Sequence, residues 1–383
     1  MKVVIAMDSF KGSISSMDAA ACVKQGILAV YKDAQVACFP MADGGEGFLD
    51  SFVYGAKAST RQVRVSGGLG EPVNAKYGIL PDQKCAVIEI AQVVGLDMIA
   101  IDKRNPLCTT TYGIGEVILD AMGQGCTEFL IGLGGSSTND GGVGMLQALG
   151  CEFLDKSGRP VGRGGQVLQE IATIQTDKMH PGLGQCKFKI ACDVDNPLYG
   201  EQGAAAVYAP QKGATPKMVS TLDKGLQNLA KRVTQALGKR EEMTAGVGAA
   251  GGLAYAFLSF LPATLQKGAS IVIACLGLEE KIKEADIVIT GEGKMDGQTA
   301  QGKAPITVAA LAKQHNKKVI AFAGMVGSGI ERCHKNGIDS IFCIQRGAID
   351  LPTAMQPATA GGNLCATAQQ VFALIHAMQS SAI

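Results

Sequence analysis

A glycine-rich loop gives this chain its most informative chemical signal. Residues 131–144 read IGLGGSSTNDGGVG, between an apolar run that predicts a buried strand and a short helix predicted over residues 145–149. Residues 134–144 contain five glycines, which let the backbone come close to a bound group, while N–H groups, hydroxyls and the positive end of a helix are available to an anion. Asp140 adds a candidate ligand for a cation that accompanies a phosphate. The alternative is a plain polar turn, although such a turn needs only one or two glycines.

Five further clusters are rich in glycine, carboxylate, amide, hydroxyl or lysine residues, at residues 8–12, 43–46, 192–197, 210–213 and 291–296. Phosphoryl transfer needs these groups: carboxylates to hold Mg²⁺, cations and N–H groups to bind phosphates, and a carboxylate to orient the acceptor hydroxyl. Each cluster also has a structural explanation on its own. Asp8 and Asp193 could cap the next element, Asp43 could bond its own turn, and Lys212 could be a solvated turn residue. Their joint occurrence favours a site.

Residues 297–304, GQTAQGKA, come close to a phosphate-loop motif but do not match it. The motif requires Ser or Thr after the lysine, and here Ala304 follows Lys303. The expected strand also ends eight residues too early. Lys303, at the start of a predicted helix, remains a candidate contact for an anionic group.

The elements that must position these clusters alternate between strand and helix. Strands are predicted at residues 3–7, 36–40, 287–289, 319–323 and 341–344, and helices at residues 17–31, 305–315 and 361–378. This alternation predicts a parallel sheet covered by helices. Open sheets of this kind bind ligands at the carboxyl ends of their strands, where Asp8, Asp43 and Glu292 occur.

The middle of the chain has a different pattern. Residues 62–90 predict antiparallel strands, and residues 216–237 predict a long helix with Thr215 as its N-cap and Gly238 at its end. Residues 271–278 are ambiguous, because their β-branched start suggests a strand while residues 276–283 continue as a helical pattern. We therefore expect an α/β fold of two domains: a Rossmann-like parallel-sheet domain, 1–63 plus 281–383, interrupted by an inserted mixed α/β domain, 64–280.

Composition excludes several classes of function. The net charge is +1 and tryptophan is absent, so neither a nucleic acid nor a membrane surface is an expected partner. The 12 cysteines form no CxxC pair, which indicates reduced thiols and a cytoplasmic protein. No segment predicts a signal peptide or a membrane span. A homo-oligomer is left open.

Taken together, the clusters resemble the bacterial glycerate kinase family, the type without a Walker loop. The matching strings cover nearly the whole chain: MDSFKGS at residues 7–13, ADGGEG at 42–47, residues 131–142, ACDVDNPL at 191–198, PQKGA at 210–214, GAAGG at 248–252 and ITGEG at 289–293. The departures are small, with Met7 where proline is usual and a variant segment at residues 294–295. The resemblance implies two α/β domains with the active site in the cleft between them. It also implies ATP-dependent phosphorylation of D-glycerate, usually at the 2-hydroxyl, giving 2-phosphoglycerate and ADP.

Hypothetical roles follow for the residues of the clusters. Asp8, Lys11, Asp43 and Asp193 are the catalytic candidates. The nucleotide ATP would be bound by Gly134, Gly135, Ser136, Ser137, Thr138, Asn139 and Gly141, together with Lys212 and Lys303. The candidate contacts for Mg²⁺ are Asp193, Glu292 and Asp296. Lys11 and Lys212 are the cations expected near the carboxylate of glycerate.

Three alternatives remain open at this point. The kinase could produce 3-phosphoglycerate or act on another small hydroxy acid. A non-catalytic sensor of a metabolite would also use glycine-rich anion loops, although it would avoid placing so many carboxylates beside its ligand. An NAD-dependent oxidoreductase is disfavoured, because the first predicted strand is followed by DSFKGS rather than by a GxGxxG helix entry.

Overall fold

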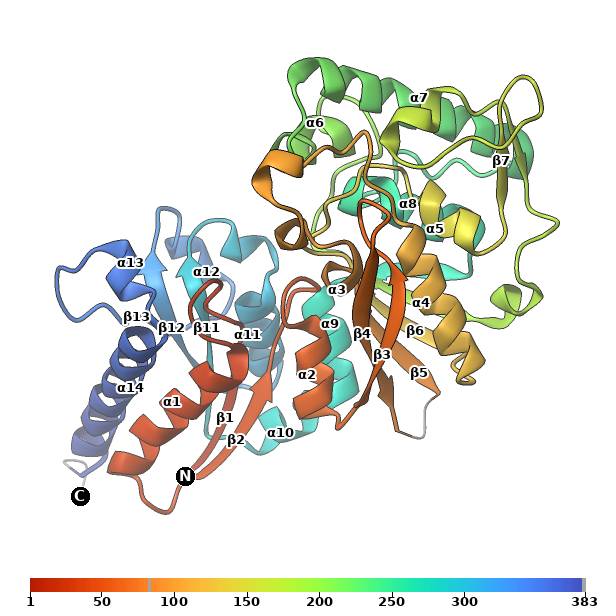
Figure 1. The fold of residues 1–383 in the computed structure, drawn as a ribbon. Helices are drawn as coiled ribbons and strands as arrows, with labels where there is room; N and C mark the ends of the chain where they lie inside the picture. Colours follow the sequence, from red (N-terminus) through yellow and green to blue (C-terminus); the bar gives the residue numbers. More distant parts are fainter. Residues whose placement is uncertain (82–83, 381–383) are drawn as a thin grey trace. The chain divides into compact units, whose positions relative to one another are not determined.

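The computed structural model describes residues 1–81 and 84–380, which form two compact units (Figure 1). The first unit comprises residues 1–43, 50–56 and 267–383, and the second comprises residues 44–49 and 57–266. We describe each unit by itself. The domain boundaries predicted from the sequence, at residues 63/64 and 280/281, remain a prediction.

The first unit is built on a five-stranded parallel sheet in the order β13-β12-β11-β1-β2. Its strands are β1 (Lys2–Met7), β2 (Gln35–Pro40), β11 (Ile287–Met295), β12 (Lys318–Val326) and β13 (Ser340–Cys343). Its helices are α1 (Ser16–Val30), α9 (Gly268–Leu276), α10 (Leu278–Glu284), α11 (Ala304–Gln314), α12 (Glu331–Lys335), α13 (Leu351–Ala354) and α14 (Pro357–Ser380), with α2 (Phe48–Gly55) shared between the units.

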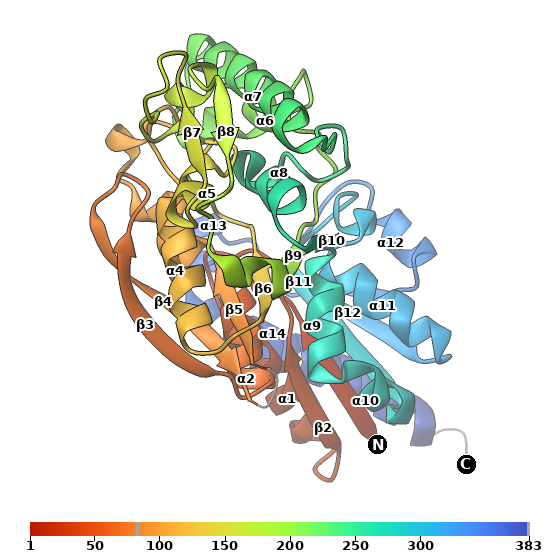
Figure 2. The same ribbon diagram turned by 90° about the vertical axis from the view of Figure 1, so that its right-hand side faces the viewer.

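Helices cover both faces of this parallel sheet. Figures 1 and 2 show α1 and α14 side by side on one face and α9, α10 and α11 on the other. Because successive side chains of a strand point to opposite faces, β1 can bury both of its sides. Val3, Ile5 and Met7 pack with α1 and α14 in one hydrophobic cluster. The carboxyl edge of the sheet is thereby held rigidly at the end of β1.

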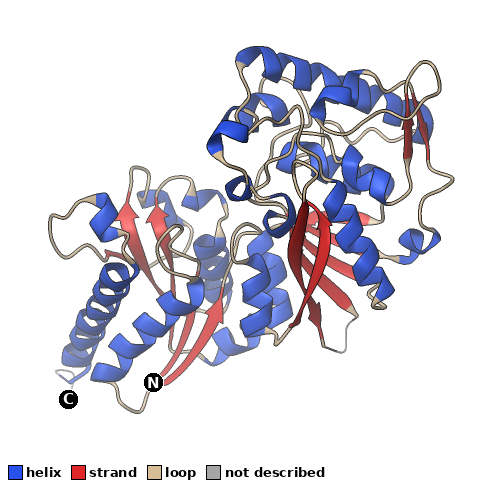
Figure 3. Ribbon diagram, viewed as in Figure 1, coloured by secondary structure: helices blue, strands red, loops and turns tan. Residues whose placement is uncertain are grey.

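The second unit contains a six-stranded mixed sheet in the order β10-β9-β6-β5-β4-β3. Its strands are β3 (Ser59–Ser66), β4 (Pro72–Leu80), β5 (Cys85–Glu89), β6 (Glu128–Gly132), β9 (Lys187–Ala191) and β10 (Ala263–Gln266), with β7 (Glu152–Leu154) and β8 (Thr173–Gln175) as a separate pair. The helices are α3 (Ala91–Val94), α4 (Tyr112–Gly123), α5 (Val143–Ala148), α6 (Ala204–Tyr208), α7 (Pro216–Leu237) and α8 (Ala249–Phe260). Figure 3 shows the helices of each unit around its strands.

The predicted α/β fold, with one parallel sheet and one mixed part, is confirmed. The ends of the long helix agree with those predicted from its capping residues. Thr215 accepts the Met218 N–H at the start of α7, and Gly238 ends the helix in a left-handed conformation. Residues 271–278, whose pattern left strand and helix open, belong mostly to helix α9, which is capped by Gly277; the strand suggested by their β-branched start does not form. A short β-branched apolar run is compatible with either structure, and tertiary packing decides between them.

Candidate active site

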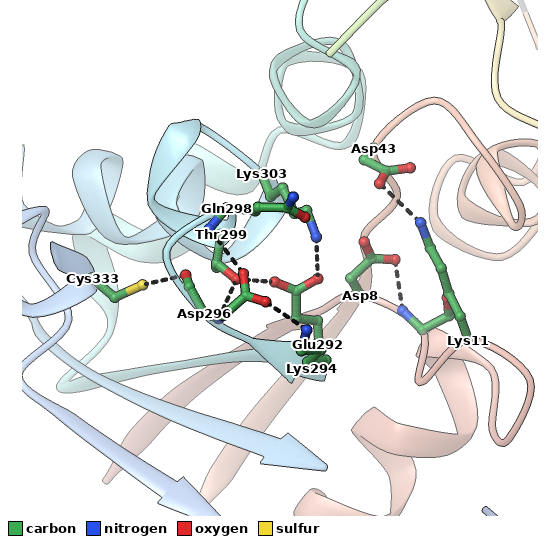
Figure 4. Close-up of polar contacts among 11 residues, drawn as sticks. Asp8, Lys11, Asp43, Glu292, Lys294, Asp296, Gln298, Thr299, Lys303 and Cys333 are labelled. Atoms are coloured by element: carbon green, nitrogen blue, oxygen red, sulfur yellow. Dashed lines mark hydrogen bonds and ion pairs between the residues drawn. The ribbon is translucent and has the colours of Figure 1, made fainter. Parts of the chain in front are cut away.

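Acidic side chains gather at the carboxyl edge of the parallel sheet in the first unit. Asp8 directly follows β1, Asp43 follows β2, and Glu292 lies on β11, the other neighbour of β1 (Figure 4). Ile5 of β1 pairs with Ile289 of β11. When this register is continued by three residues, Asp8 lies level with Glu292. The sheet thus brings together three carboxylates that are far apart in the sequence.

Asp8 is the most deeply buried of these acids, with only 2% of its surface exposed. One carboxylate oxygen accepts the Ser9 N–H at 2.6 Å, whereas its buried Oδ2 has no hydrogen-bond partner among the described residues. Burial and the nearby Asp43 carboxylate raise the pKa of Asp8 to about 8, against the opposing effect of Lys11. A carboxyl group that exchanges its proton near neutral pH has the property of a general base.

Lys11 is the cation of this cluster. Its ammonium group donates to Asp43 Oδ2 at 3.1 Å, and its side chain remains 54% exposed. Burial lowers the pKa of Lys11, but the carboxylates of Asp43 and Asp8 outweigh this effect and raise it above its ordinary value. Lys11 is therefore a permanently charged group with donors still available to an anion.

Glu292 is held in place from two sides. Its carboxylate accepts the Thr299 hydroxyl at 2.6 Å and lies 3.5 Å from the ammonium group of Lys303, the N-cap residue of α11. Burial raises the pKa of Glu292, while Thr299 and Lys303 oppose this effect. The sequence placed Glu292 in a loop, but β11 continues through it, because Glu292 pairs with Ala323 of β12.

Asp296 belongs to the same edge but is engaged with its neighbours. It forms an ion pair with Lys294 at 2.9 Å and accepts the Gln298 N–H at 2.8 Å, which lower its pKa. Among residues 1–81 and 84–380, no group of three or more His, Cys, Asp or Glu side chains is placed to hold a metal ion. Asp193, the third predicted metal contact, belongs to the second unit.

The glycine-rich loop follows β6 in the second unit and packs against residues 44–49. The Gly134 N–H donates to the Gly44 carbonyl at 2.9 Å. A Cβ on Gly134 would lie 2.3 Å from Gly45 Cα, so only glycine allows this close approach. Gly44 directly follows Asp43 in the chain. Two of the motifs found in the sequence are therefore in direct backbone contact.

Four side chains of this loop differ in what they can offer a ligand. The Ser137 hydroxyl donates to the Val94 carbonyl at 2.8 Å, so its only proton is already used. By contrast, the Thr138 hydroxyl and the Asn139 amide are buried and have no partner in the described part of the chain. The Ser136 hydroxyl accepts from Lys212 and keeps its proton. Ser136, Thr138 and Asn139 thus keep hydrogen-bonding capacity that no described residue uses.

Backbone groups of the loop point to the same conclusion. Within the residues that the structure describes, the N–H groups of Gly135, Ser136, Thr138 and Asn139 donate no hydrogen bond to the protein. Buried N–H groups are normally paired, and unpaired ones beside unpaired side chains suit a phosphate. The donor set therefore fits a polyphosphate group.

Asp140 has a different role from the expected one. Its carboxylate accepts the N–H and hydroxyl of Thr111 and the N–H groups of Gly142 and Gly144, at 2.8–3.2 Å. These contacts cap the first turn of α5, so neither Asp140 nor the end of α5 is free for a ligand. The expectation that this helix end binds the anion is corrected: the loop before it carries the free donors.

Lys212 is not the solvated turn residue that its sequence context allowed. It is 2% exposed, and its ammonium group donates to Ser136 Oγ at 2.9 Å and to the Thr138 carbonyl at 2.6 Å. Burial lowers the pKa of Lys212 to about 7, against the opposing effect of Asp140. The lysine therefore contacts the glycine-rich loop from within the protein.

Asp193 and Glu89 occupy the same edge of the mixed sheet as this loop. Asp193 is exposed and comes two residues after the end of β9, the strand next to β6. Glu89 ends β5 on the other side of β6, and its buried carboxylate accepts the Leu49 N–H at 3.0 Å. Glu89 was not among the residues predicted from the sequence. The feature that could have pointed to it is a carboxylate at the end of the otherwise apolar run CAVIE.

The chain matches known proteins over almost its full length. The family model described as the glycerate kinase family matches residues 3–376. The chain belongs to the glycerate kinase family. The resemblance stated from the motifs is thus confirmed, as is the prediction of an enzyme that transfers a phosphoryl group to an alcohol.

Individual relatives of this family are similar along the whole chain. A glycerate kinase of Halalkalibacterium halodurans is 44% identical over 379 residues, which cover 99% of each protein. A glycerate 2-kinase of Escherichia coli (strain K12) is 41% identical over 375 residues, or 98% of each. A crystal structure from Salmonella typhimurium LT2, provisionally assigned as glycerate kinase 2, has a TM-score of 0.89, 41% identity and 99% coverage of both chains.

Proposed function

We propose that this protein phosphorylates D-glycerate with ATP at the 2-hydroxyl, giving 2-phosphoglycerate and ADP. Membership of the glycerate kinase family supports glycerate as the acceptor. The relative from Escherichia coli, which bears the name glycerate 2-kinase, supports the position. A location in the cytoplasm and a homo-oligomeric state remain proposals. No helix in the described part of the chain is long and apolar enough to cross a membrane.

One observation carries the proposal: the buried Asp8 carboxyl with its unpaired Oδ2, at the edge of the parallel sheet. An unpaired buried carboxylate oxygen is costly and suits a partner that only a ligand supplies. A hydroxyl group donates one proton, which matches this acceptor. Asp8 would orient the 2-hydroxyl of glycerate and take its proton late, because phosphoryl transfer needs little proton removal before the phosphorus–oxygen bond breaks.

The neighbouring groups would bind the rest of the acceptor. Lys11 has free donors near Asp8 and suits the carboxylate of glycerate. Asp43 holds Lys11 and can accept a second hydroxyl. Lys303, paired with Glu292, would stabilise charge on the transferring phosphoryl group. Among these residues, Lys11 would bind the carboxylate, and Asp8 and Asp43 would accept hydroxyl groups, as a small hydroxy acid requires.

The donor ATP would place its phosphates on the glycine-rich loop. Ser136, Thr138, Asn139 and the unpaired N–H groups supply the contacts. Mg²⁺ would enter with the nucleotide, since this ion usually keeps phosphate and water ligands and takes only one or two protein carboxylates. Asp193, Glu292 and Asp296 remain the candidates for those contacts. Bound in this way, the ion neutralises phosphate charge.

Both clusters would serve one reaction in a cleft between the two predicted domains, 1–63 plus 281–383 and 64–280. Support comes from the resemblance of the motifs to the glycerate kinase family, which implies two α/β domains with the active site between them. Closure around the substrates would exclude water and prevent hydrolysis of ATP.

The direct test measures ADP formation from Mg-ATP with D-glycerate, L-glycerate and other small hydroxy acids. We expect turnover with D-glycerate, a loss of about 100-fold in Asp8→Asn, and a similar loss in Asp193→Asn. Asp195→Asn changes an exposed acid two residues further and is the matched control, which should keep its turnover. Wild-type turnover in Asp193→Asn would remove Asp193 from the site. Nucleotide binding without ADP formation would favour a sensor.

A further inference from the structure

The backbone around Lys212 directs this side chain into the protein. Lys212 ends a short 3₁₀ turn, Pro210–Lys212, and Gly213 follows with φ of 94°. A Cβ at Gly213 would lie 2.3 Å from the Arg104 carbonyl oxygen, so this turn is packed against the segment before α4 and requires glycine. With its backbone fixed in this way, Lys212 has its ammonium group beneath the glycine-rich loop rather than in water.

The hydrogen bonds of Lys212 are incomplete. Its ammonium group has three donors, of which two contact Ser136 Oγ and the Thr138 carbonyl. Because Ser136 Oγ accepts this bond, the Ser136 proton points away from Lys212 and can be donated to another acceptor. Lys212 therefore fixes both the position of Ser136 and the direction in which its hydroxyl donates.

The charge of Lys212 is also uncompensated. In the described part of the chain no carboxylate lies within 4.0 Å of its ammonium group. Asp140, on the loop, is the titratable group that faces it, but the Asp140 oxygens are engaged with Thr111, Gly142 and Gly144. The contact from the segment before α4 is made by the Arg104 carbonyl group. A buried cation without a paired anion is costly, and a bound phosphate would remove that cost.

We propose that Lys212 is the positioning residue of the phosphate site, which holds Ser136 and Thr138 in place and gains its charge when a nucleotide phosphate binds in the loop. This inference rests on the proposed function, because it takes the loop as the nucleotide site. It differs from the roles of Lys212 expected from the sequence, which were a direct contact with ATP and a direct contact with the carboxylate of glycerate.

The sign of the proton linkage follows from burial. Because burial lowers the pKa of Lys212 to about 7, the free protein is mostly uncharged at this residue at pH 8. A bound phosphate favours the ammonium form and raises this pKa, so binding takes up a proton. At pH 8 the phosphates of ADP are already fully ionised and contribute no proton of their own.

Isothermal titration of ADP with Mg²⁺ at pH 8, in two buffers of different ionisation enthalpy, measures this proton. We expect an uptake of up to about one proton per ADP in the wild type and none in Lys212→Met, which should also bind ADP about 10-fold more weakly. Lys217→Met, an exposed lysine at the start of α7, is the matched control and should behave as the wild type. Repeating the titration in Asp8→Asn removes the other group with a pKa near 8.

The possible results distinguish a failure of this inference from a failure of the proposed function. ADP binding by the wild type without proton uptake, or equal uptake in Lys212→Met, would overturn the role of Lys212 and leave the nucleotide site in place. No ADP binding by the folded wild type would overturn both. The wild-type titration needs no variant, so the inference stays testable even if Lys212→Met does not fold.

Discussion

The ammonium group of Lys11 donates to Asp43 Oδ2 at 3.1 Å, and both charges act on the buried carboxyl of Asp8. Asp43 raises the pKa of Asp8 and Lys11 lowers it. The pair therefore adjusts the proton affinity of a third residue that has an unpaired oxygen. With Asp8 as the proposed base, this arrangement would link catalysis, pH dependence and stability at one edge of the parallel sheet.

Asp8→Asn should lose activity and gain stability at alkaline pH. The pKa of Asp8 is raised in the folded protein, so its contribution to stability is complete below pH 4 and is lost as the pH rises toward 8. The Asp8→Asn variant has no carboxyl group to ionise at this position, so its stability does not fall in this way as the pH rises. We expect its free energy of unfolding at pH 9 to exceed that of the wild type by about 2–5 kcal/mol, with the difference shrinking toward pH 4. Denaturant unfolding at both pH values measures it, and an equal stability at pH 9 would contradict the burial of a charged Asp8.

Lys11→Met should move the pH profile of the enzyme to higher pH. Without the ammonium group the pKa of Asp8 rises further, and the base is ionised only at higher pH. We expect the rise of kcat/KM for glycerate with pH to shift upward, together with a higher KM. Lys11→Arg keeps the charge and should shift the profile less. An unchanged pH profile in Lys11→Met would show that the charge of Lys11 does not influence the ionisation of Asp8.

Thr138→Val and Ser137→Ala should have opposite effects. The Thr138 hydroxyl has no partner in the described protein, so its replacement by a methyl group should leave the free energy of unfolding unchanged or higher, while KM for ATP rises about 10-fold. Ser137→Ala removes a bond to Val94 and should lower stability by about 1 kcal/mol with little change in KM. Steady-state kinetics and thermal unfolding of both variants distinguish the two roles. A higher KM for ATP in Ser137→Ala, together with a lower stability in Thr138→Val, would exchange the roles of the two residues.

Gly251→Ala should displace the glycine-rich loop. Gly251 has φ of 68°, and a Cβ there would lie 2.2 Å from the Thr138 carbonyl oxygen. Gly238, at the end of α7, has nearly the same φ of 69° but open space around it. We therefore expect Gly238→Ala to cost only about 1–2 kcal/mol of stability, whereas Gly251→Ala should in addition lose nucleotide binding. Equal nucleotide affinity in the two variants would show that the loop tolerates the contact.

The secondary structure could be predicted where local signals agree. Ser15 caps α1 and Thr215 caps α7. In both helices the apolar residues recur at helical spacing, and the side of the helix on which they lie is the buried one. Prediction failed where local and tertiary preferences differ. The strand β11 continues through Glu292 because β12 pairs with it along the whole segment, and glycines at 291 and 293 do not reveal that pairing in the sequence.

The candidate site was predictable as a set of residues but not as a set of contacts. The Ser137 hydroxyl bonds Val94, 43 residues away, so its structural role depends on a packing that no local pattern encodes. Lys212 occupies a turn, where lysine is usually solvated, and only the fold shows it beneath the loop. Glu89 was missed for the same reason, because its partner Leu49 lies 40 residues before it.

The most direct measurement is phosphorus NMR of the products after the purified protein is incubated with Mg-ATP and D-glycerate. We expect the signals of ADP and 2-phosphoglycerate, and about 100-fold less of both products in Asp8→Asn over the same time. A 3-phosphoglycerate signal would keep the kinase and contradict the position of transfer. Unchanged ATP in the presence of folded wild-type protein and D-glycerate would contradict the central claim.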